Sequence, residues 1–163
     1  MCVCGFKDPE KLPVYVRNSI EDLQSTTKNC DGFIINLCIS YGSRTEILNA
    51  CKSVAQKVLD NEIKISDIDE TIFSQSLVSK DLPGNYKCLI FNAACIQLIL
   101  IIFVIDPDIL IRTSGEFRLS NFLLWQLAYT EMFFINKYWP EVSKDDLYSI
   151  LEKYSQRNRR YGK

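Results

Sequence analysis

Hydrophobic residues recur along this chain with two different spacings, and the spacing predicts where helices and strands lie. Apolar positions three and four residues apart indicate amphipathic helices, whereas short continuous apolar runs indicate buried strands. In chain order, the predicted elements are a helix over Pro13–Thr27, a strand over Phe33–Ile39, helices over Thr45–Leu59 and Ser66–Ser76, a strand over Ile109–Arg112, and helices over Asn121–Phe134 and Lys144–Gln156.

The order of these elements predicts the fold class. Strands that alternate with helices are typical of an α/β layer with a parallel sheet, and the strand over Phe33–Ile39 is apolar on both faces, as parallel sheets require. The chain has 163 residues, of which 47% are hydrophobic, so it can bury a core. Two predicted strands are too few for a stable sheet. We therefore expect the chain to form part of a larger α/β domain.

The segment from Asp106 to Glu131 carries the strongest candidate chemistry. Its strand contains Arg112, a polar loop with Arg118 follows, and Ser120 is the natural N-cap of the helix expected from Asn121. Helix N-termini and arginine forks both stabilise bound anions, so the segment predicts a diphosphate-binding site. Taken singly, each residue also fits a structural role: Arg112 in a surface ion pair, Ser120 as an ordinary cap.

The ordered string resembles a known family. Residues from Asp106 to Gln126 are similar to the C-terminal signature of the cis-prenyltransferases, the undecaprenyl and dehydrodolichyl diphosphate synthases. Three further matches extend the resemblance over about three quarters of the chain: Ser40-Tyr41-Gly42-Ser43-Arg44 for the Asn-Tyr-Gly-Gly-Arg core, Tyr138-Trp139-Pro140, and Arg157 to Gly162. The expected fold is thus the C-terminal part of a parallel-sheet cis-prenyltransferase fold with flanking helices.

The resemblance implies an activity and its residues. Family members add isopentenyl diphosphate to an allylic diphosphate such as farnesyl diphosphate, with Mg²⁺ as cofactor. Residues matching the substrate-binding positions are Arg112, Arg118, Leu119, Ser120, Arg160 and Gly162. Glu131 matches the magnesium-associated glutamate. On one helix, Ser120 and Glu131 would lie about 16 Å apart along the axis, so we expect Glu131 to serve the opposite end of the site or a site shared across a dimer.

The resemblance also implies a partner subunit. Members form homodimers or pair with a noncatalytic relative, and this account assigns the aromatic cluster of Tyr129, Phe133, Phe134, Tyr138 and Trp139 to the interface, whereas the simpler account places it in the core. The arginines near the C-terminus are expected either in a solvated tail or at a partner's active site.

Departures from the family pattern matter as much as the matches. Nothing in residues 1–30 resembles the Asp-Gly-Asn-x-Arg motif that supplies the catalytic aspartate, so we expect no catalytic residue in this chain and interpret it as the C-terminal part of a synthase. Ser43 replaces a common glycine, and Phe117 stands where some members have histidine. The chain has no histidine at all, which excludes histidine-based nucleophilic chemistry.

The stretch from Gly84 to Ile105 interrupts the family pattern. Its apolar run from Leu89 to Ile105 is marginally long enough for a membrane span, but Asn92 and Gln97 argue against one. Without these 22 residues, Pro83 would join Asp106 directly, as in the family, and codons for Gly84-Asn85 and Ile105-Asp106 can contain splice signals. We expect an unspliced intron, with a genuine insertion as the alternative.

Composition limits the remaining partners and functions. The net charge of −1 and the lack of a basic stripe, apart from the arginines near the C-terminus, argue against nucleic acid as the main partner. Seven cysteines without a secretory leader indicate free thiols in a reducing compartment, hence a cytoplasmic location, with the endoplasmic reticulum surface and peripheral membrane contact left open. Two functions remain: a prenyl-transferring enzyme, or a noncatalytic subunit that binds a diphosphate or a catalytic partner.

Overall fold

The computed structural model describes residues 12–30, 35–39, 41–78, 89–92, 97–100 and 107–158. Within these ranges the helices are α1 (Val14–Thr27), α2 (Ser43–Leu59), α3 (Glu70–Ser74) and α4 (Lys144–Ser155), with short 3₁₀ turns at Ile65–Asp67 and Trp139–Glu141. The strands are β1 (Ile35–Cys38), β2 (Leu89–Asn92), β3 (Gln97–Leu100), β4 (Ile109–Arg112) and β5 (Glu131–Phe134).

The central sheet is parallel, as predicted. It has the strand order β2-β4-β5, and Ile109 pairs with Leu89 on one side and with Glu131 on the other. All four residues of β4 are buried, which agrees with its unbroken apolar sequence up to Arg112. The α/β class and the strand over Ile109–Arg112 are therefore confirmed.

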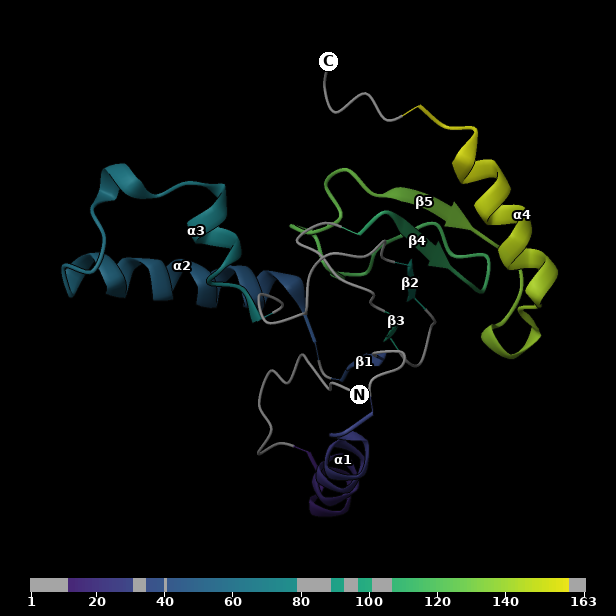
Figure 1. Cartoon of the computed structure of the whole chain (residues 1–163), viewed down its shortest axis with the longest axis horizontal. Helices are drawn as coiled ribbons and strands as arrows, with labels where there is room; N and C mark the ends of the chain where they lie inside the picture. The colour runs from purple at the N-terminus through teal and green to yellow at the C-terminus, as the bar shows by residue number, and fades with distance from the viewer. Residues whose placement is uncertain are drawn as a thin grey trace.

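The two faces of β4 are covered by different parts of the chain. Leu110 packs on one face in a cluster with Cys38, Phe122, Leu123 and Leu127. On the other face, Ile109 and Ile111 pack with Phe133 and with Ile150 of α4. Figure 1 shows α2 and α3 on one side of the strands and α4 on the other. The alternation of side chains along a strand produces this division.

The helix predicted over Asn121–Phe134 is wrong. Residues 120–129 form a series of turns, and residues 131–134 form β5, which extends the sheet beside β4. Three non-glycine residues of the turns, Ser120, Asn121 and Leu123, have left-handed backbone angles (φ 51°, 63° and 44°) that an α-helix does not contain. The apolar residues of this segment bury against β4 without helical geometry, so their spacing alone was misleading.

Two smaller predictions also need correction. The strand predicted over Phe33–Ile39 is present as β1, but it pairs antiparallel with β3, with Ile35 opposite Leu100. The short helix predicted from Ser66 or Asp67 begins later, at Glu70, because the Asp69 side chain accepts a hydrogen bond from the Ile72 backbone N–H at 2.8 Å and caps the helix.

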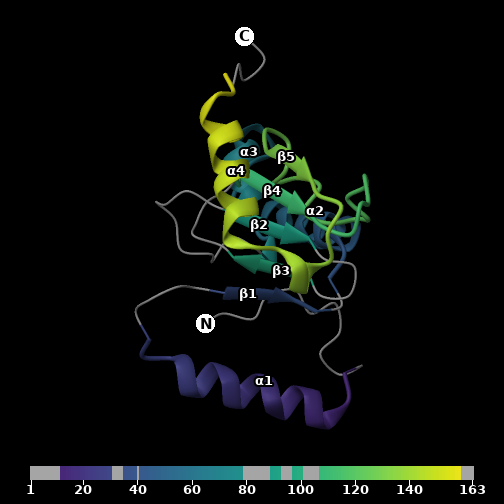
Figure 2. The same ribbon diagram turned by 90° about the vertical axis from the view of Figure 1, so that its right-hand side faces the viewer.

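The predicted helices over Pro13–Thr27, Thr45–Leu59 and Lys144–Gln156 are confirmed as α1, α2 and α4 within one or two residues. Helix α1 lies apart from the sheet, below β1 in both ribbon views, and none of its residues is buried (Figures 1 and 2). Helix α4, by contrast, crosses the face of the sheet in Figure 2.

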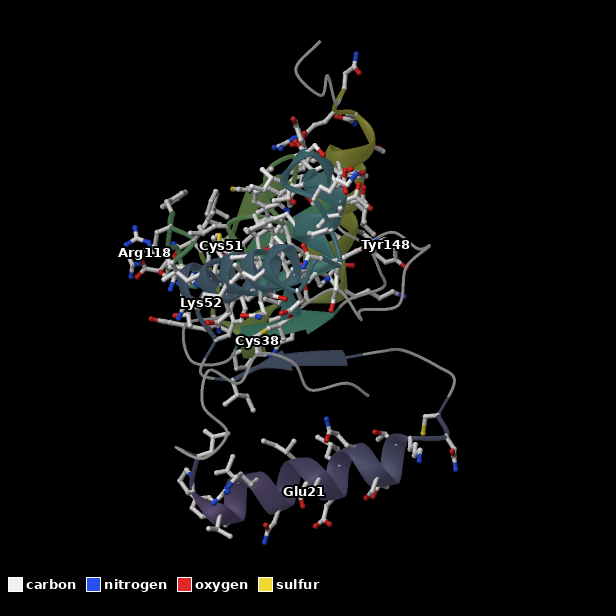
Figure 3. All side chains as sticks on the ribbon, turned by 90° about the vertical axis from the view of Figure 1, so that its left-hand side faces the viewer. Glu21, Cys38, Cys51, Lys52, Arg118 and Tyr148 are labelled. Atoms are coloured by element: carbon white, nitrogen blue, oxygen red, sulfur yellow. The ribbon has the colours of Figure 1, made fainter. Side chains whose placement is uncertain are left out.

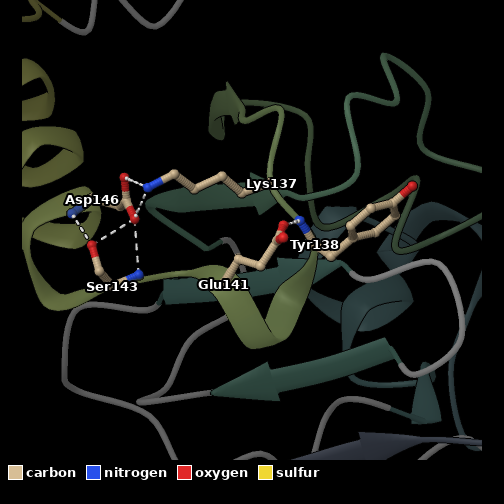
Figure 4. A network of polar contacts seen from close by, with 5 residues as sticks. All are labelled: Lys137, Tyr138, Glu141, Ser143 and Asp146. Carbon is tan, nitrogen blue, oxygen red and sulfur yellow. Dashed lines mark hydrogen bonds and ion pairs between the residues drawn. The ribbon is translucent and has the colours of Figure 1, made fainter.

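A capping network fixes the beginning of α4. The Ser143 hydroxyl donates to Asp146 Oδ2 at 2.7 Å, and the Asp146 carboxylate also accepts from Lys137 Nζ at 2.8 Å (Figure 4). Tyr138 N–H donates to Glu141 at 2.8 Å in the turn just before. The pKa of Asp146 lies well below its ordinary value of 3.8 because of the hydrogen bonds from Lys137 and Ser143. The network ties the end of the β5 segment to the first turn of α4.

The segment 84–105 contributes β2 and β3 where the structure describes it. In both ribbon views β3 lies next to β2. No helix within the described ranges is long and apolar enough to cross a membrane.

Candidate functional site

Arg112 is the central residue of the candidate site. It is the last residue of β4, and it is only 5% exposed even though it carries a guanidinium group. Its pKa is lowered first by burial and then by the positive charge of Arg118, while Glu116 acts in the opposite direction. The structure therefore brings Arg112, Arg118 and Glu116 close enough for their charges to interact. A bound anion would relieve the repulsion between the two arginines.

The turn after β4 is fastened to the end of β5. Ser114 N–H donates to the Lys137 carbonyl at 2.7 Å, and Gly115 N–H donates to the Ile135 carbonyl at 3.0 Å. Gly115 has φ +67°, and a Cβ atom there would meet Asn136 Oδ1 at 2.8 Å, so this position requires glycine. Because these two amide groups already have partners, neither of them is available to a ligand in this conformation.

Arg118 lies at the open edge of the site. Its side chain is 64% exposed and makes an ion pair with Glu116. Figure 3 shows Arg118 at the margin of the molecule, directed away from the ribbon. Between Glu116 and Arg118, the Phe117 ring is exposed and stacks near Phe134, with ring centroids 5.2 Å apart. The candidate site therefore has positive charge both on an exposed side chain, Arg118, and on a buried one, Arg112.

Ser120 is not the N-cap of a helix, because no helix begins at Asn121. It is exposed in a turn, and its left-handed backbone places it next to Arg118 and Leu119. Leu119 is half-buried and packs against the cluster around Leu110. The predicted binding residues Arg112, Arg118, Leu119 and Ser120 therefore lie on one continuous stretch from strand end to loop, without the predicted helix dipole.

The helix terminus that does lie near this loop is that of α2, and Asn121 occupies it. Gly42 is the N-cap and offers no side chain. Ser43 N–H donates instead to the Asn121 carbonyl at 2.8 Å, and Arg44 N–H donates to Asn121 Oδ1 at 2.9 Å. Two of the backbone donors that a helix start leaves open are thus satisfied from a residue far away in sequence.

Glu131 lies at the other end of the strands from Arg112. In the parallel register, Ile109 is opposite Glu131 and Arg112 is opposite Phe134. Three residues of a strand span about 10 Å. The expectation that Glu131 would not share a small diphosphate with Ser120 was based on a helix that does not exist, but the strand register separates Glu131 from Arg112 as well.

The Glu131 carboxylate forms an ion pair with Arg157, whose guanidinium carbon also lies 4.4 Å from the Phe133 ring centroid. Nearby, Tyr154 donates to Asp108 Oδ1 at 3.2 Å. No group of three or more His, Cys, Asp or Glu residues in the described part of the chain could hold a metal ion. Magnesium needs only one or two carboxylates when phosphates complete its shell. Glu131 therefore fits as a single ligand, provided that Arg157 moves away.

Arg160 and Gly162, the other two predicted binding residues, lie outside the described residues. The cysteines that the structure describes, Cys30, Cys38 and Cys51, are free thiols, in agreement with the composition.

Several residues that position the site were missed at the sequence level. Glu46 of α2 is 4% exposed and accepts hydrogen bonds from the Tyr41 hydroxyl and, at 3.1 Å, from Gln126 Nε2. Burial and the neighbouring Glu46 charge raise the pKa of Tyr41 well above its ordinary value. The only signal in the sequence is spacing, since Glu46 stands four and eight positions before Ala50 and Val54, which share its buried side of α2.

A buried arginine at the carboxyl end of a parallel strand, beside a polar loop with a second arginine, gives this α/β protein a candidate anion-binding site where the strand ends. The family profile of undecaprenyl diphosphate synthase, a prenyltransferase family, matches residues 1–162. The chain therefore belongs to the cis-prenyltransferase family. This confirms the resemblance found in the sequence.

Individual relatives agree. An isoprenyl transferase of Oceanobacillus iheyensis is 39% identical over 155 residues, which cover 95% of this chain and 53% of that protein. A tritrans,polycis-undecaprenyl-diphosphate synthase of Thermoplasma volcanium is 40% identical over 152 residues, which cover 93% of this chain and 50% of that protein. The chain thus spans about half the length of the curated relatives it matches.

Solved structures of the family share the fold. Lavandulyl diphosphate synthase from Lavandula x intermedia, in complex with dimethylallyl diphosphate, aligns with a TM-score of 0.77 and 31% identity over 99% of this chain and 60% of that one. An undecaprenyl diphosphate synthase described as probable, from Campylobacter jejuni, aligns with a TM-score of 0.69 and 30% identity, over 99% of this chain and 62% of that one.

Proposed function

We propose that this chain provides the isopentenyl diphosphate side of a cis-prenyltransferase, which joins isopentenyl diphosphate to an allylic diphosphate to build a polyprenyl or dehydrodolichyl diphosphate. The observation that supports this most is the buried guanidinium of Arg112, next to Arg118, at the carboxyl end of a parallel strand. A diphosphate carries the charge and the planar oxygen pairs that arginine forks bind well.

Each residue of the proposed site has a separate role in binding the diphosphate, which follows from its position. Arg112 would bind the diphosphate at the floor of the site, because burial strengthens its electrostatic attraction to an anion. Arg118 would exchange its ion pair with Glu116 for one with the ligand, and the exposed Ser120 hydroxyl would donate to a phosphate oxygen. Leu119 holds this loop on the core. Arg160 and Gly162 remain proposed substrate contacts on the strength of the family pattern.

Magnesium, when bound, would neutralise phosphate charge and polarise the bond to the leaving group. Glu131 is the proposed ligand, for phosphates at the opposite end of the site from Arg112 or at a site shared across a dimer. Its pairing with Arg157 means that metal binding requires a local rearrangement of the C-terminal segment or a partner subunit that takes over Arg157. A homodimer or a heterodimer is therefore part of the proposal. We also propose that the enzyme acts from the cytoplasm, with peripheral contact to a membrane such as that of the endoplasmic reticulum, because its product is a lipid.

The first experiment is a titration of the 163-residue chain with isopentenyl diphosphate by calorimetry, with isopentenyl alcohol as the matched control. We expect saturable binding of the diphosphate and none of the alcohol, because the charged groups carry the affinity. Equal behaviour of the two ligands, or no binding of either, would exclude the proposed site.

A noncatalytic subunit is the second candidate. The observation in its favour is that the one proposed metal ligand is already neutralised by Arg157. Incorporation of radiolabelled isopentenyl diphosphate into longer allylic products separates the two functions. Turnover with farnesyl diphosphate and Mg²⁺ would support the enzyme, while binding without turnover, including in the presence of a complete synthase, would support the subunit.

The origin of residues 84–105 is a separate part of the proposal. We propose that they are a retained intron, with a genuine family-specific insertion as the alternative. Sequencing the messenger RNA from its 5′ end through the codons for Pro83 and Asp106 tests this. A direct junction of these two codons, with an upstream Asp-Gly-Asn-x-Arg frame, is the expected result. A transcript that begins at Met1 and keeps the segment would favour the noncatalytic candidate.

A further inference from the structure

The loop that carries the proposed diphosphate contacts is attached to α2 at one small area. Asn121 follows Ser120 directly, and it satisfies the first two N–H groups of α2, those of Ser43 and Arg44, at 2.8 and 2.9 Å. In return, the Ser43 hydroxyl accepts a hydrogen bond from Leu124 N–H at 2.9 Å. These three hydrogen bonds, which we call the Asn121–Ser43 clamp, join segments about eighty positions apart in the sequence.

The geometry of the clamp leaves little freedom. Ser43 is completely buried. A Cβ atom on Gly42 would meet Asn121 Nδ2 at 2.8 Å, so the chain before α2 and the loop are in close contact. Because the Asn121 side chain is held at its oxygen by Arg44 N–H, it cannot easily turn aside to make room.

The loop needs such support because its backbone is unfavourable. Ser120, Asn121 and Leu123 all have positive φ, a region that side chains other than glycine and asparagine rarely adopt. Backbone conformations of this kind persist only where surrounding contacts impose them. The clamp supplies those contacts at Asn121 itself and at Leu124, which follows Leu123.

Ser43 is the residue that departs from the family pattern, in which glycine is common at this position. Its hydroxyl is the acceptor for the Leu124 amide, and a glycine could not provide it. In this chain the departure is therefore not merely tolerated. It adds a direct hydrogen bond between the start of α2 and the signature loop.

We propose that Asn121 and Ser43 are positioning residues for diphosphate binding. Neither contacts the ligand. They fix the loop conformation in which Ser120 and Arg118 face the same anion as Arg112, and their loss lowers affinity by releasing the loop. This inference rests on the proposed function for its consequence, but the clamp itself can be tested without any ligand.

The test uses four variants of the full chain, with inorganic pyrophosphate as the probe. Asn121→Asp keeps the acceptor oxygen and the tolerance for positive φ, so the Arg44 amide proton should exchange within about twofold of its rate in the unsubstituted chain. Its added negative charge should weaken pyrophosphate binding by repulsion, so amide exchange is the measurement for this variant. Asn121→Gly removes the acceptor without adding backbone strain and should weaken binding about tenfold, the loss expected from roughly one hydrogen bond. Ser43→Ala should weaken binding about threefold to tenfold for the same reason.

Ser74→Ala is the matched control. It removes the hydrogen bond that Trp125 Nε1 donates to Ser74 Oγ at 3.0 Å, at the far side of the same loop. Affinity should stay within about twofold, since a typical hydrogen bond lost there does not act on Ser120. Equal losses in Ser74→Ala and Asn121→Gly would mean that any destabilisation of the loop has the same effect, and this result would overturn the proposal.

Amide hydrogen exchange measured by NMR separates the clamp from the proposed function. In Asn121→Gly, the Arg44 and Leu124 amide protons should exchange at least about tenfold faster than in the unsubstituted chain, while the amides of α4 stay unchanged. If pyrophosphate does not bind the unsubstituted chain, the proposed function fails, and the positioning role fails with it. If pyrophosphate binds equally well to Asn121→Gly and exchange is unchanged, only the clamp proposal is overturned.

Discussion

The two ends of the parallel strands β4 and β5 carry charged groups in opposite arrangements. At the carboxyl end, Arg112 is buried and Arg118 is exposed, with one carboxylate, Glu116, between them. At the amino end, Glu131 is paired with Arg157 and Asp108 accepts a hydrogen bond from Tyr154. One end therefore has two arginines beside one carboxylate, while at the other end two carboxylates lie near one arginine and a neutral tyrosine.

The comparison assigns ligand binding to the carboxyl end of the strands and attachment of α4 to their amino end. Two arginines beside one carboxylate favour an anion, and a position just after a parallel strand is where ligands of α/β proteins bind. Apolar packing of Ile150 with Ile109 and Ile111 and the hydrogen bond from Tyr154 to Asp108 hold α4 on the sheet. The following four predictions test whether the two ends are as independent as this comparison implies, and they run from the largest expected effect to the smallest.

Replacing Arg112 by alanine should abolish most diphosphate affinity. Loss of about two charge-assisted hydrogen bonds predicts a decrease of roughly a hundredfold or more. Calorimetry with inorganic pyrophosphate measures it. Arg112→Lys is the matched control and should recover only part of the affinity, because lysine keeps the charge but not the planar fork. Affinity equal to that of the unsubstituted chain would show that Arg112 is structural.

Replacing Arg118 and Glu116 should change affinity in opposite directions. Arg118→Ala should weaken pyrophosphate binding about tenfold, since it removes one exposed charged contact. Glu116→Gln should tighten it by roughly twofold to fivefold, because Arg118 no longer has to leave a carboxylate. The same calorimetric titration at two salt concentrations checks both, and the two effects should shrink at high salt. Weaker binding in Glu116→Gln would contradict this account.

Breaking the pair at the other end should leave binding intact. Arg157→Met should change pyrophosphate affinity in the absence of Mg²⁺ by less than about twofold, and it should lower the free energy of unfolding by at most about 1 kcal/mol, because both side chains are partly exposed. Urea unfolding measures the second quantity. A tenfold loss of affinity in Arg157→Met would show that the two ends act together, and would refute the comparison.

The smallest effect is expected at Asp146, which pairs with Lys137 and anchors the start of α4 beside the carboxyl end of β5. Its pKa is held below the ordinary 3.8 by hydrogen bonds from Lys137 and Ser143. A carboxyl group whose pKa is lower in the folded state than in the unfolded state stabilises the fold at pH values above its unfolded-state pKa. This stability is lost as the pH falls from the unfolded-state pKa towards the folded-state pKa. In Asp146→Asn, the stability measured by urea unfolding should therefore fall less steeply with acidification below about pH 4. An unchanged slope would assign the acid sensitivity to other carboxylates.

The regions that sequence reasoning predicted well share strong local signals. For α4, Ser143 and Asp146 form a capping box before an amphipathic run, and for β4, a short apolar run follows a proline turn. Both features are contained in a few neighbouring residues. The arginines of the proposed site, Arg112 and Arg118, could be proposed from the sequence because they stand in one contiguous motif.

The regions that were predicted wrongly depend on distant partners. Residues from Asn121 to Leu127 have helix-like apolar spacing, yet their backbone is set by Ser43 on α2 and by the face of β4. Likewise, β1 is antiparallel because its partner is β3, which lies in a segment that interrupts the family pattern. Spacing cannot reveal a hydrogen bond to a residue eighty positions away.

The sequence by itself determined the family, the α/β class, the positions of α1, α2, α4 and β4, and the arginines of the proposed site, because short motifs and local periodicity encode all of them. Only the tertiary structure decided that Asn121 caps α2, that Glu131 begins a strand and pairs with Arg157, and that Arg112 and Glu131 lie at opposite strand ends. The physical reason is the same in each case. Strand pairing and long-range hydrogen bonds outweigh the weak local preference of the residues that they join.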